Sequence, residues 1–413
     1  MKTIELAALA KTASRSVRLL DNEVRSSILN EFADNLLNGQ ESILTANDQD
    51  IAAARVEGRT DAFLDRLRLT PERIAAMAQG VREIAAMADP LGRVLEKKTI
   101  RSGVRLVKKT VPMGVIGIIF ESRPNVTADC AALCLKAGSA CILKGGKESL
   151  HSCLAITEEM HKAMRKYSLD ENALVLLGNP DREETNALME CREYVDLLIP
   201  RGSSRLINAV VRQAKVPVIE TGAGICHTFV DESADLQMAD RIVFNAKCSR
   251  PSVCNAMETL LVHEKIAEQF LPICASSLKE KNVIIHGDEQ SRTILKDILP
   301  ADDTNYATEY NDFEMNIKIV KDVSEAIAHI ETFGTHHSDC IVTENAENVL
   351  AFFNGVDSAC VYHNASTRFT DGGEFGMGAE IGISTQKLHA RGPMGLNELT
   401  TYAYYLEGNG EIR

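Results

Sequence analysis

The sequence predicts an α/β protein with two domains built on parallel sheets and a small additional β arm. From Val115 onward, short apolar segments alternate with helix-length segments, which is the rhythm of βαβ units and of a parallel sheet covered on both faces. A second series of such segments follows toward the C-terminus. At 413 residues the chain is longer than one hydrophobic core usually supports, which favours two large domains.

The elements before Val115 are predicted to be mainly helical. Apolar residues between Val24 and Leu37 recur at the three- and four-residue spacing of an amphipathic helix, and this pattern extends over the first hundred residues. Between Arg101 and Thr110, Val104 and Leu106 alternate with basic residues, as in an exposed hairpin strand.

The two series of apolar segments are predicted to be strands, with the two domains joined near His227. The predicted strands are Val115–Phe120, Ala140–Leu143, Leu174–Leu177, Val195–Ile199 and Val216–Ile219, then Thr259–Val262, Val283–Ile285, Ile317–Val320, Cys340–Val342 and Ser358–Tyr362. The tail, Thr400–Arg413, contains three tyrosines in a β-prone run. It is either a plain edge strand or, with the hairpin, an arm exchanged with a second subunit.

Composition excludes several classes of protein. A formal charge of -13 disfavours nucleic acid as a partner, because phosphate backbones are bound by clustered Lys and Arg. The N-terminus does not look like a signal peptide, and the longest apolar runs are too short to span a bilayer, so we expect no membrane association and a cytoplasmic location. The 11 cysteines are an odd number without a CxxC pair, which favours reduced thiols; no metal site is expected.

Cys254 is a candidate nucleophile. It lies in a polar loop between a predicted helix and a predicted strand, and Lys247 or Arg250 could favour its thiolate form. A buried structural cysteine is the alternative, and Cys248 is equally plausible on composition.

Three segments at strand ends could bind anions. Lys144-Gly-Gly-Lys147 combines glycines, which allow close backbone approach, with lysines that can hold phosphate or ribose oxygens; a solvated turn is the alternative. Gly202 and Ser203 begin a predicted helix whose amides could bind a pyrophosphate or simply be capped. The run Glu121–Asn125 offers an arginine, a hydroxyl and an amide for a carboxylate, a phosphate or an oxyanion. The adjacent His336 and His337 fit a loop or positioning element better than a catalytic base.

Six longer motifs occur in order along essentially the whole chain: Val115–Val126, Ile199–Ser203, Ile219–Gly222, Arg250–Glu258, Ala326–Ile330 and His337–Asp339. Together they resemble the gamma-glutamyl phosphate reductase (glutamate-5-semialdehyde dehydrogenase) family within the aldehyde dehydrogenase superfamily. The resemblance implies an aldehyde-dehydrogenase-like α/β fold in three parts. These are a cofactor-binding domain (residues 1–98 and 113–226), a catalytic domain (227–394) and a small β oligomerisation arm (99–112 and 395–413) that makes a homodimer or higher oligomer.

The resemblance also implies roles for individual residues. Cys254 would be the nucleophile, Lys144 would contact the adenosine ribose, and Gly202 with Ser203 would lie under the pyrophosphate. Lys147 stands where NAD-preferring relatives often carry a glutamate, and a cation there would favour the 2′-phosphate of NADP. We therefore expect NADPH as cofactor.

The implied reaction is NADPH-dependent reduction of L-glutamyl 5-phosphate to L-glutamate 5-semialdehyde and phosphate through a thioester on Cys254, the second step of proline synthesis from glutamate. A separate glutamate 5-kinase would supply the acyl phosphate. The superfamily's hydrolytic base aligns with Glu220, which reduction does not require, so its role stays open. The oxyanion donor stays open between Ser122 and Asn125, in addition to the Cys254 amide.

Arg123 and Arg391 are hypotheses for holding the carboxylate or phosphate of the substrate, with surface salt bridges as the alternative. One departure from the family stands before Cys226, where Ile225 replaces the usual asparagine.

Two other functions fit parts of the pattern. An aldehyde dehydrogenase oxidising an aldehyde to a free acid with NAD would need a base that activates water. A cysteine hydrolase or acyltransferase would bind no dinucleotide. A purely structural role would leave the Cys254 loop without a purpose.

Overall fold

The computed structural model describes residues 1–179 and 181–413, which form two compact units. Unit 1 consists of Met1–Thr221, Gly376–Gly382 and Met394–Arg413, and unit 2 of Gly222–Phe375 and Ile383–Pro393. The fold is the predicted mixed α/β one, with a parallel sheet in each unit. Among the described residues, no helix has both the length and the apolar character needed to cross a membrane.

Unit 1 begins with five helices, which confirms the helical prediction as far as Ala86. Side chains of Asp21, Thr60 and Thr70 accept hydrogen bonds from backbone amides at the first turns of the second, fourth and fifth helices. The prediction was wrong for Val94–Thr99, which is a strand. The helices are α1 (Thr3–Leu19), α2 (Asn22–Asn38), α3 (Gln40–Val56), α4 (Asp61–Leu67) and α5 (Pro71–Ala86).

The main sheet of unit 1 has four parallel strands in the order β5-β4-β3-β6. Every residue of β3 and β4 is buried, which explains why both read as uninterrupted apolar runs. The predicted strand at 216–219 is wrong: only an isolated bridge joins Val218 to Leu198. The elements are β3 (Val115–Phe120), α6 (Asn125–Lys136), β4 (Ala140–Lys144), η1 (Lys147–Ser149), α7 (Leu150–Lys166), η2 (Glu171–Ala173), β5 (Leu174–Leu176), α8 (Arg182–Glu190), β6 (Leu197–Arg201) and α9 (Ser204–Gln213).

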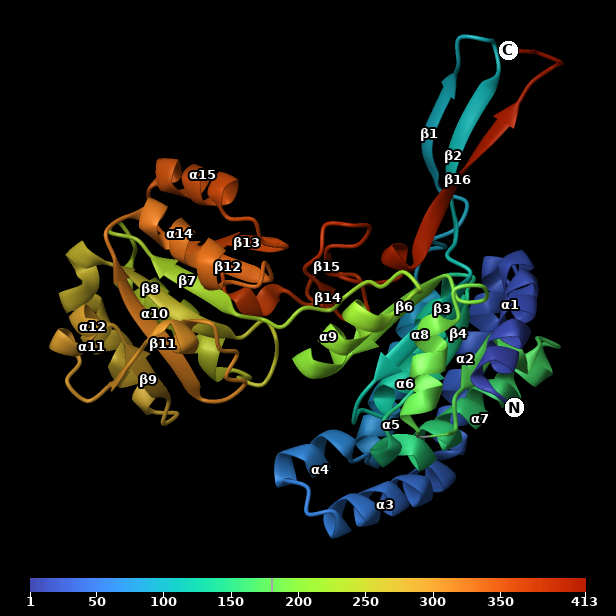
Figure 1. The fold of residues 1–413 in the computed structure, drawn as a ribbon, viewed down its shortest axis with the longest axis horizontal. Helices are drawn as coiled ribbons and strands as arrows, with labels where there is room; N and C mark the ends of the chain where they lie inside the picture. Colours follow the sequence, from blue (N-terminus) through green and yellow to red (C-terminus); the bar gives the residue numbers. More distant parts are fainter. Residues whose placement is uncertain (180) are drawn as a thin grey trace. The chain divides into compact units, whose positions relative to one another are not determined.

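A separate antiparallel sheet of three strands projects from the rest of unit 1 (Figure 1). It is formed by β1 (Val94–Thr99), β2 (Arg105–Pro112) and β16 (Thr400–Glu407), the last preceded by the short helix η4 (Asn397–Leu399). β2 is the central strand, so the predicted hairpin and the C-terminal run do come together.

Unit 2 contains a parallel sheet of seven strands in the order β10-β9-β11-β8-β7-β12-β13. Each predicted strand of the second series is present, within a few residues at its ends; β7, which contains His227, was not predicted. The strands are β7 (Cys226–Val230), β8 (Met257–His263), β9 (Ile284–Gly287), β10 (Leu299–Pro300), β11 (Glu314–Val320), β12 (Ser338–Val342) and β13 (Cys360–His363). A two-stranded sheet, β14 (Ile383–Ser384) with β15 (Gly392–Pro393), completes this unit.

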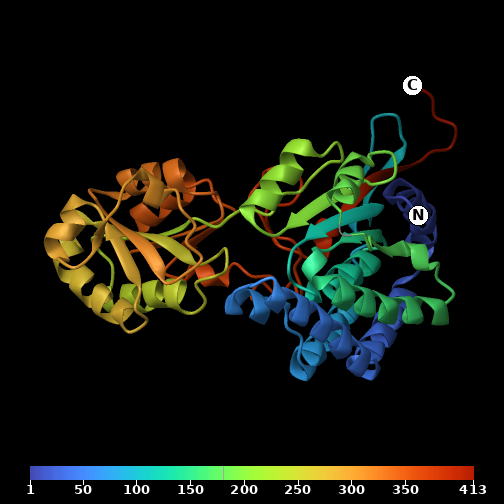
Figure 2. The same ribbon diagram turned by 60° about the horizontal axis from the view of Figure 1, so that its bottom comes forward.

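Helices cover both faces of this sheet (Figure 2). Leu260 and Val262 pack with α10 and α11 on one face, whereas Leu261 packs with α14 and α15 on the other. This alternation follows from the two-residue repeat of a strand. The remaining helices are α10 (Leu236–Cys248), α11 (Glu264–Lys279), α12 (Glu289–Ile294), α13 (Asp303–Tyr306), α14 (Val323–Phe333), α15 (Ala346–Gly355) and η3 (Thr367–Phe369).

Candidate active site

Cys254 lies in the loop between α10 and β8 of unit 2 and is partly accessible. The competing Cys248 is buried in the last turn of α10, and burial raises the pKa of its thiol to about 11. Of the eleven cysteines, all described, nine are buried; Cys254 and Cys360 are the exceptions. Because a thiolate is the reactive form, the structure favours Cys254 over Cys248 as nucleophile.

The backbone of the Cys254 loop is held against the segment before β7. A Cβ atom on Gly224 would lie 1.4 Å from the Cys254 carbonyl oxygen, so only glycine fits here. The same carbonyl accepts a hydrogen bond from Cys226 Sγ at 3.2 Å. The Gly224 amide donates to Glu309 Oε1 at 2.8 Å, which fixes the glycine in turn.

A second segment, η3, fastens the other side of the loop. Asn255 Nδ2 donates to the Thr370 carbonyl at 2.8 Å, and Thr367 Oγ1 donates to the Asn255 carbonyl at 2.7 Å. The Arg368 guanidinium donates through Nη1 to Asn255 Oδ1 and through Nε to Ser249 Oγ at 3.1 Å. Arg368 is therefore held beside the candidate nucleophile, and sequence reasoning did not select it.

The position of this segment explains why it was missed. Asn364 lies near the carboxyl end of β12. Its backbone N–H donates to the Ile341 carbonyl, and its side-chain Oδ1 accepts from the Thr343 backbone N–H. Thr370 lies at the amino end of β12, with its Oγ1 2.6 Å from Ser338 Oγ. The chain thus returns along the sheet to the amino ends of the strands, where Cys254 also lies. Rules that place sites at carboxyl ends of parallel strands do not anticipate this.

A buried ion pair flanks the Cys254 loop. Lys247 Nζ, at the end of α10, lies 2.7 Å from Glu258 Oε2 in β8, and the two side chains are 0% and 1% exposed. Burial raises the pKa of Glu258 to about 7, against the opposing effect of Lys247. The pair ties the two ends of the loop together.

Two histidines of unit 2, His337 and His227, are fully buried. His337 is buried, its Nδ1 lies 2.8 Å from Ser338 Oγ, and burial lowers its pKa to about 4. His227 Nδ1 lies 3.1 Å from Asp339 Oδ1 in the sheet. For the His336–His337 pair, a loop or positioning role stays a prediction.

Arg391, the residue of unit 2 predicted to bind substrate, forms an ion pair with Asp357. Its Nη2 donates to the Asp357 carbonyl at 2.8 Å and to Oδ1 at 2.9 Å. Lys387 first, and then Arg391, lower the pKa of the Asp357 carboxyl. A substrate carboxylate would have to share Arg391 with this aspartate.

Eight predicted site residues belong to unit 1, and most of them gather at one edge of its sheet. Since β3, β4 and β6 are adjacent and parallel, the segments after them meet at their shared carboxyl ends. Glu220 follows the isolated bridge beside β6 and is half-buried, and Arg123 is half-buried after β3.

Ser122 and Asn125, the candidate oxyanion donors, have carboxylate partners. The amide and Oγ of Ser122 both donate to Glu148 Oε1, at 3.0 and 2.7 Å, and these bonds hold Ser122 in the left-handed region at φ 48°. Asn125 Nδ2 donates to Asp129 Oδ2 at 3.0 Å.

The two lysines after β4 have different surroundings. Lys144 is buried, burial lowers its pKa, and its Nζ donates to the Gly145 carbonyl at 3.1 Å. Lys147 is exposed, and its Nζ lies 2.8 Å from Glu57 Oε1.

The start of α9 already holds an anion. The Ser203 amide donates to Glu121 Oε2 at 2.8 Å, and Ser203 Oγ caps the helix by accepting from the Leu206 amide. A Cβ on Gly202 would lie 2.5 Å from the same carboxylate oxygen. Glu121 thus places a carboxylate at the Ser203 amide, where the helix dipole favours negative charge.

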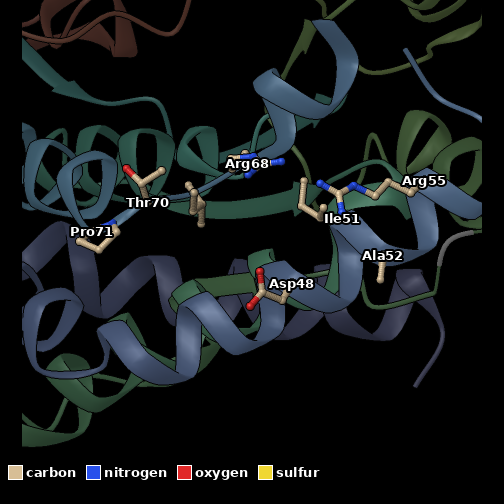
Figure 3. Close-up of a pocket in the computed structure, with 8 residues that line it drawn as sticks. Asp48, Ile51, Ala52, Arg55, Arg68, Thr70 and Pro71 are labelled. Atoms are coloured by element: carbon tan, nitrogen blue, oxygen red, sulfur yellow. The ribbon is translucent and has the colours of Figure 1, made fainter. Parts of the chain in front are cut away.

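Unit 1 also contains a cavity of about 380 Å³ (Figure 3). Its lining comes from α3 and the segment joining α4 to α5: Asp48, Ile51, Ala52, Arg55, Arg68, Leu69, Thr70 and Pro71. None of the predicted site residues lines it. Within residues 1–179 and 181–413, no cluster of three or more potential metal ligands was found.

Comparison with known proteins agrees with this fold. The family model described as "Aldehyde dehydrogenase family" matches residues 2–293. An acetylating aldehyde dehydrogenase from Geobacillus thermoglucosidasius has the same fold, with a TM-score of 0.71 at 15% identity over 100% of this chain and 98% of that one. The chain is thus of the aldehyde dehydrogenase class.

Much closer similarity connects it to one group within that class. The gamma-glutamyl phosphate reductase of Carboxydothermus hydrogenoformans is 51% identical over 412 residues, covering 100% of this chain and 99% of that protein. The crystal structure of gamma-glutamyl phosphate reductase from Thermotoga maritima has a TM-score of 0.98 at 43% identity and covers 100% of both chains. The chain belongs to the gamma-glutamyl phosphate reductase family.

Proposed function

We propose that the protein reduces L-glutamyl 5-phosphate to L-glutamate 5-semialdehyde and phosphate, with NADPH as reductant. The observation that carries this proposal is the partly accessible Cys254 in a loop fixed on both sides, within a chain whose full-length relatives are named for this reaction. This reaction is the second step of proline synthesis from glutamate.

The chemistry requires a thiolate held in a defined position. Cys254 Sγ bonds to the acyl carbon, the bond from that carbon to the phosphate oxygen breaks, and a thioester remains. We propose that the Cys254 amide, with Ser122 or Asn125, donates to the acyl oxygen while it carries negative charge. A bound nicotinamide cofactor would supply a hydride to the thioester carbon. The carbon–sulfur bond then breaks, which releases the aldehyde and returns the Cys254 thiolate. No water has to be activated, so Glu220 need not act as a base.

The residues at the sheet edge of unit 1 suit a dinucleotide phosphate. The Ser203 amide at the start of α9 already donates to a carboxylate, and Lys144 brings a buried ammonium group to the same edge. We propose that Gly202 and Ser203 bind the pyrophosphate and that Lys144 binds the adenosine ribose. Lys147 would face the 2′-phosphate of NADP, once released from Glu57.

We propose that unit 1 is the cofactor-binding domain and unit 2 the catalytic domain, with the three-stranded arm used for oligomerisation. Tyr402 and Tyr404 are each 51% exposed on β16, and Leu406 is 56% exposed. Such exposed apolar side chains on an outer strand fit pairing with a second copy. Arg123 and Arg391 remain proposed substrate ligands. A cytoplasmic location fits the NADPH supply, and a glutamate 5-kinase would provide the acyl phosphate.

The test is the reverse reaction, reduction of NADP by glutamate semialdehyde in the presence of inorganic phosphate. We expect phosphate-dependent activity that prefers NADP to NAD and disappears in Cys254→Ala. Cys248→Ala is the matched control and should retain activity. Activity that does not need phosphate would instead indicate a hydrolytic aldehyde dehydrogenase, and absence of dinucleotide binding would indicate a hydrolase or acyltransferase.

A further inference from the structure

Two arginines of unit 2 contribute positive charge to the region around Cys254. They come from segments that are far apart in the sequence. Arg250 precedes Cys254 in the same loop, and Arg368 comes from η3. Arg368 is half-buried, and its Nε and Nη1 are anchored to Ser249 Oγ and Asn255 Oδ1. The hydrogen bonds found for Arg368 use Nε and Nη1. The anchored guanidinium therefore has a fixed position, and its five N–H donors are more than these two bonds use.

The positive charges of Arg368 and Arg250 favour the binding of an anion beside them. Burial lowers the pKa of Arg368, and Arg250 lowers it further, while Asp371 and a Cys254 thiolate act in the opposite direction. Arg368 is half-buried and Arg250 is exposed, and the mutual repulsion of the two guanidinium groups is relieved when an anion binds between them.

We propose that Arg368, assisted by Arg250, is the binding site for the phosphoryl group of the acyl phosphate and for the inorganic phosphate released from it. This inference rests on the function proposed above. Guanidinium groups bind phosphate oxygens with two parallel hydrogen bonds, and a phosphoryl group carries close to the two negative charges that two arginines would balance.

The chemistry places the phosphoryl group, rather than the substrate's carboxylate, beside the nucleophile. The phosphorus is joined through one oxygen to the carbon that Cys254 attacks, whereas the α-carboxylate is at the far end of the carbon chain. As the carbon–sulfur bond forms, the bond between carbon and the bridging oxygen breaks and that oxygen takes the electron pair. A guanidinium held at this oxygen stabilises the charge that develops on it.

The experiment compares the wild-type protein with Arg368→Gln and Arg368→Lys in the phosphate-dependent reverse reaction. Inorganic phosphate is varied at saturating semialdehyde and NADP. Loss of a charged hydrogen-bond donor should raise the KM for phosphate by roughly 10- to 150-fold in Arg368→Gln and by less in Arg368→Lys, with the KM for semialdehyde unchanged. Arg241→Gln, an exposed change of the same charge on α10, is the matched control and should leave all constants unchanged.

If Arg368 had a structural role only, its replacement would change kcat rather than the KM for phosphate. If it only clamps the loop, kcat should fall while the KM for phosphate stays constant, which would overturn the phosphate site. A rise in the KM for semialdehyde alone would also overturn it, by assigning Arg368 to the substrate's carboxylate.

Titration calorimetry of the cofactor-free protein with inorganic phosphate gives a second readout, in which the variants should bind more weakly. Wild-type protein without phosphate-dependent activity would overturn the proposed function and this site together, whereas an active wild type with unaffected variants would overturn only this site.

Discussion

Replacing Lys247 by methionine should destabilise unit 2, and the loss should depend on pH. The change leaves Glu258 in a site where its side chain is 1% exposed and has lost its ammonium partner at 2.7 Å. Breaking a buried pair by removing one partner costs about 3–5 kcal/mol. For a domain of this size, that corresponds to a fall in Tm of roughly 6–20 °C.

The pH dependence follows from Glu258. Its pKa in the folded protein is about 7, above the ordinary 4.5, because burial disfavours the carboxylate. The folded protein therefore binds this proton more tightly than the unfolded chain does. As a result, the free energy of unfolding falls as the pH rises from 4.5 to 7, and above pH 7 this group causes no further change. The group's total contribution is on the order of 3 kcal/mol. Without Lys247, which opposes the rise, the pKa of Glu258 should be higher still.

Thermal unfolding of wild type and Lys247→Met should be followed at about pH 6 and about pH 8 by far-ultraviolet circular dichroism, since the chain has no tryptophan. We expect a larger difference in Tm at the higher pH, where the variant must either bury a lone carboxylate or hold its proton. Lys247→Met combined with Glu258→Gln should recover part of the loss. Equal Tm values for wild type and variant, or a larger loss at the lower pH, would refute this reasoning.

Three further predictions concern other parts of the chain. Gly224→Ala should lower kcat by about 100-fold or more, because its Cβ would displace the Cys254 carbonyl, whereas Gly80→Ala, whose Cβ meets no atom within 4 Å, should keep full activity. Ser203→Ala should lower stability by about 1 kcal/mol through loss of the α9 cap; an unchanged unfolding midpoint would contradict that cap. Tyr404→Asp on the arm should reduce the mass found by light scattering, and an unaltered mass would argue against an oligomeric contact at this residue.

The local patterns of the chain were sufficient for most of the fold. β3 and β4 were recognisable because fully buried strands are short apolar runs, and the early helices because an amphipathic repeat extends over several turns. β7 was missed: its Cys226-His-Thr-Phe-Val230 sequence mixes polar and apolar residues, yet every one is buried in the sheet. Burial of polar groups there depends on partners such as Asp339, which only the folded sheet supplies.

The sequence by itself determined most strands of the two series, the position of Cys254 in a loop and the polar segments after β3, β4 and β6, because each depends on residues a few positions apart. Only the tertiary structure decided which groups surround Cys254. Arg368 reaches Asn255 across 113 residues because the chain turns back along the sheet after β13, and Gly224 meets the Cys254 carbonyl because β7 and β8 are neighbours. Such contacts arise when the sheet closes, and no periodicity in the chain encodes them.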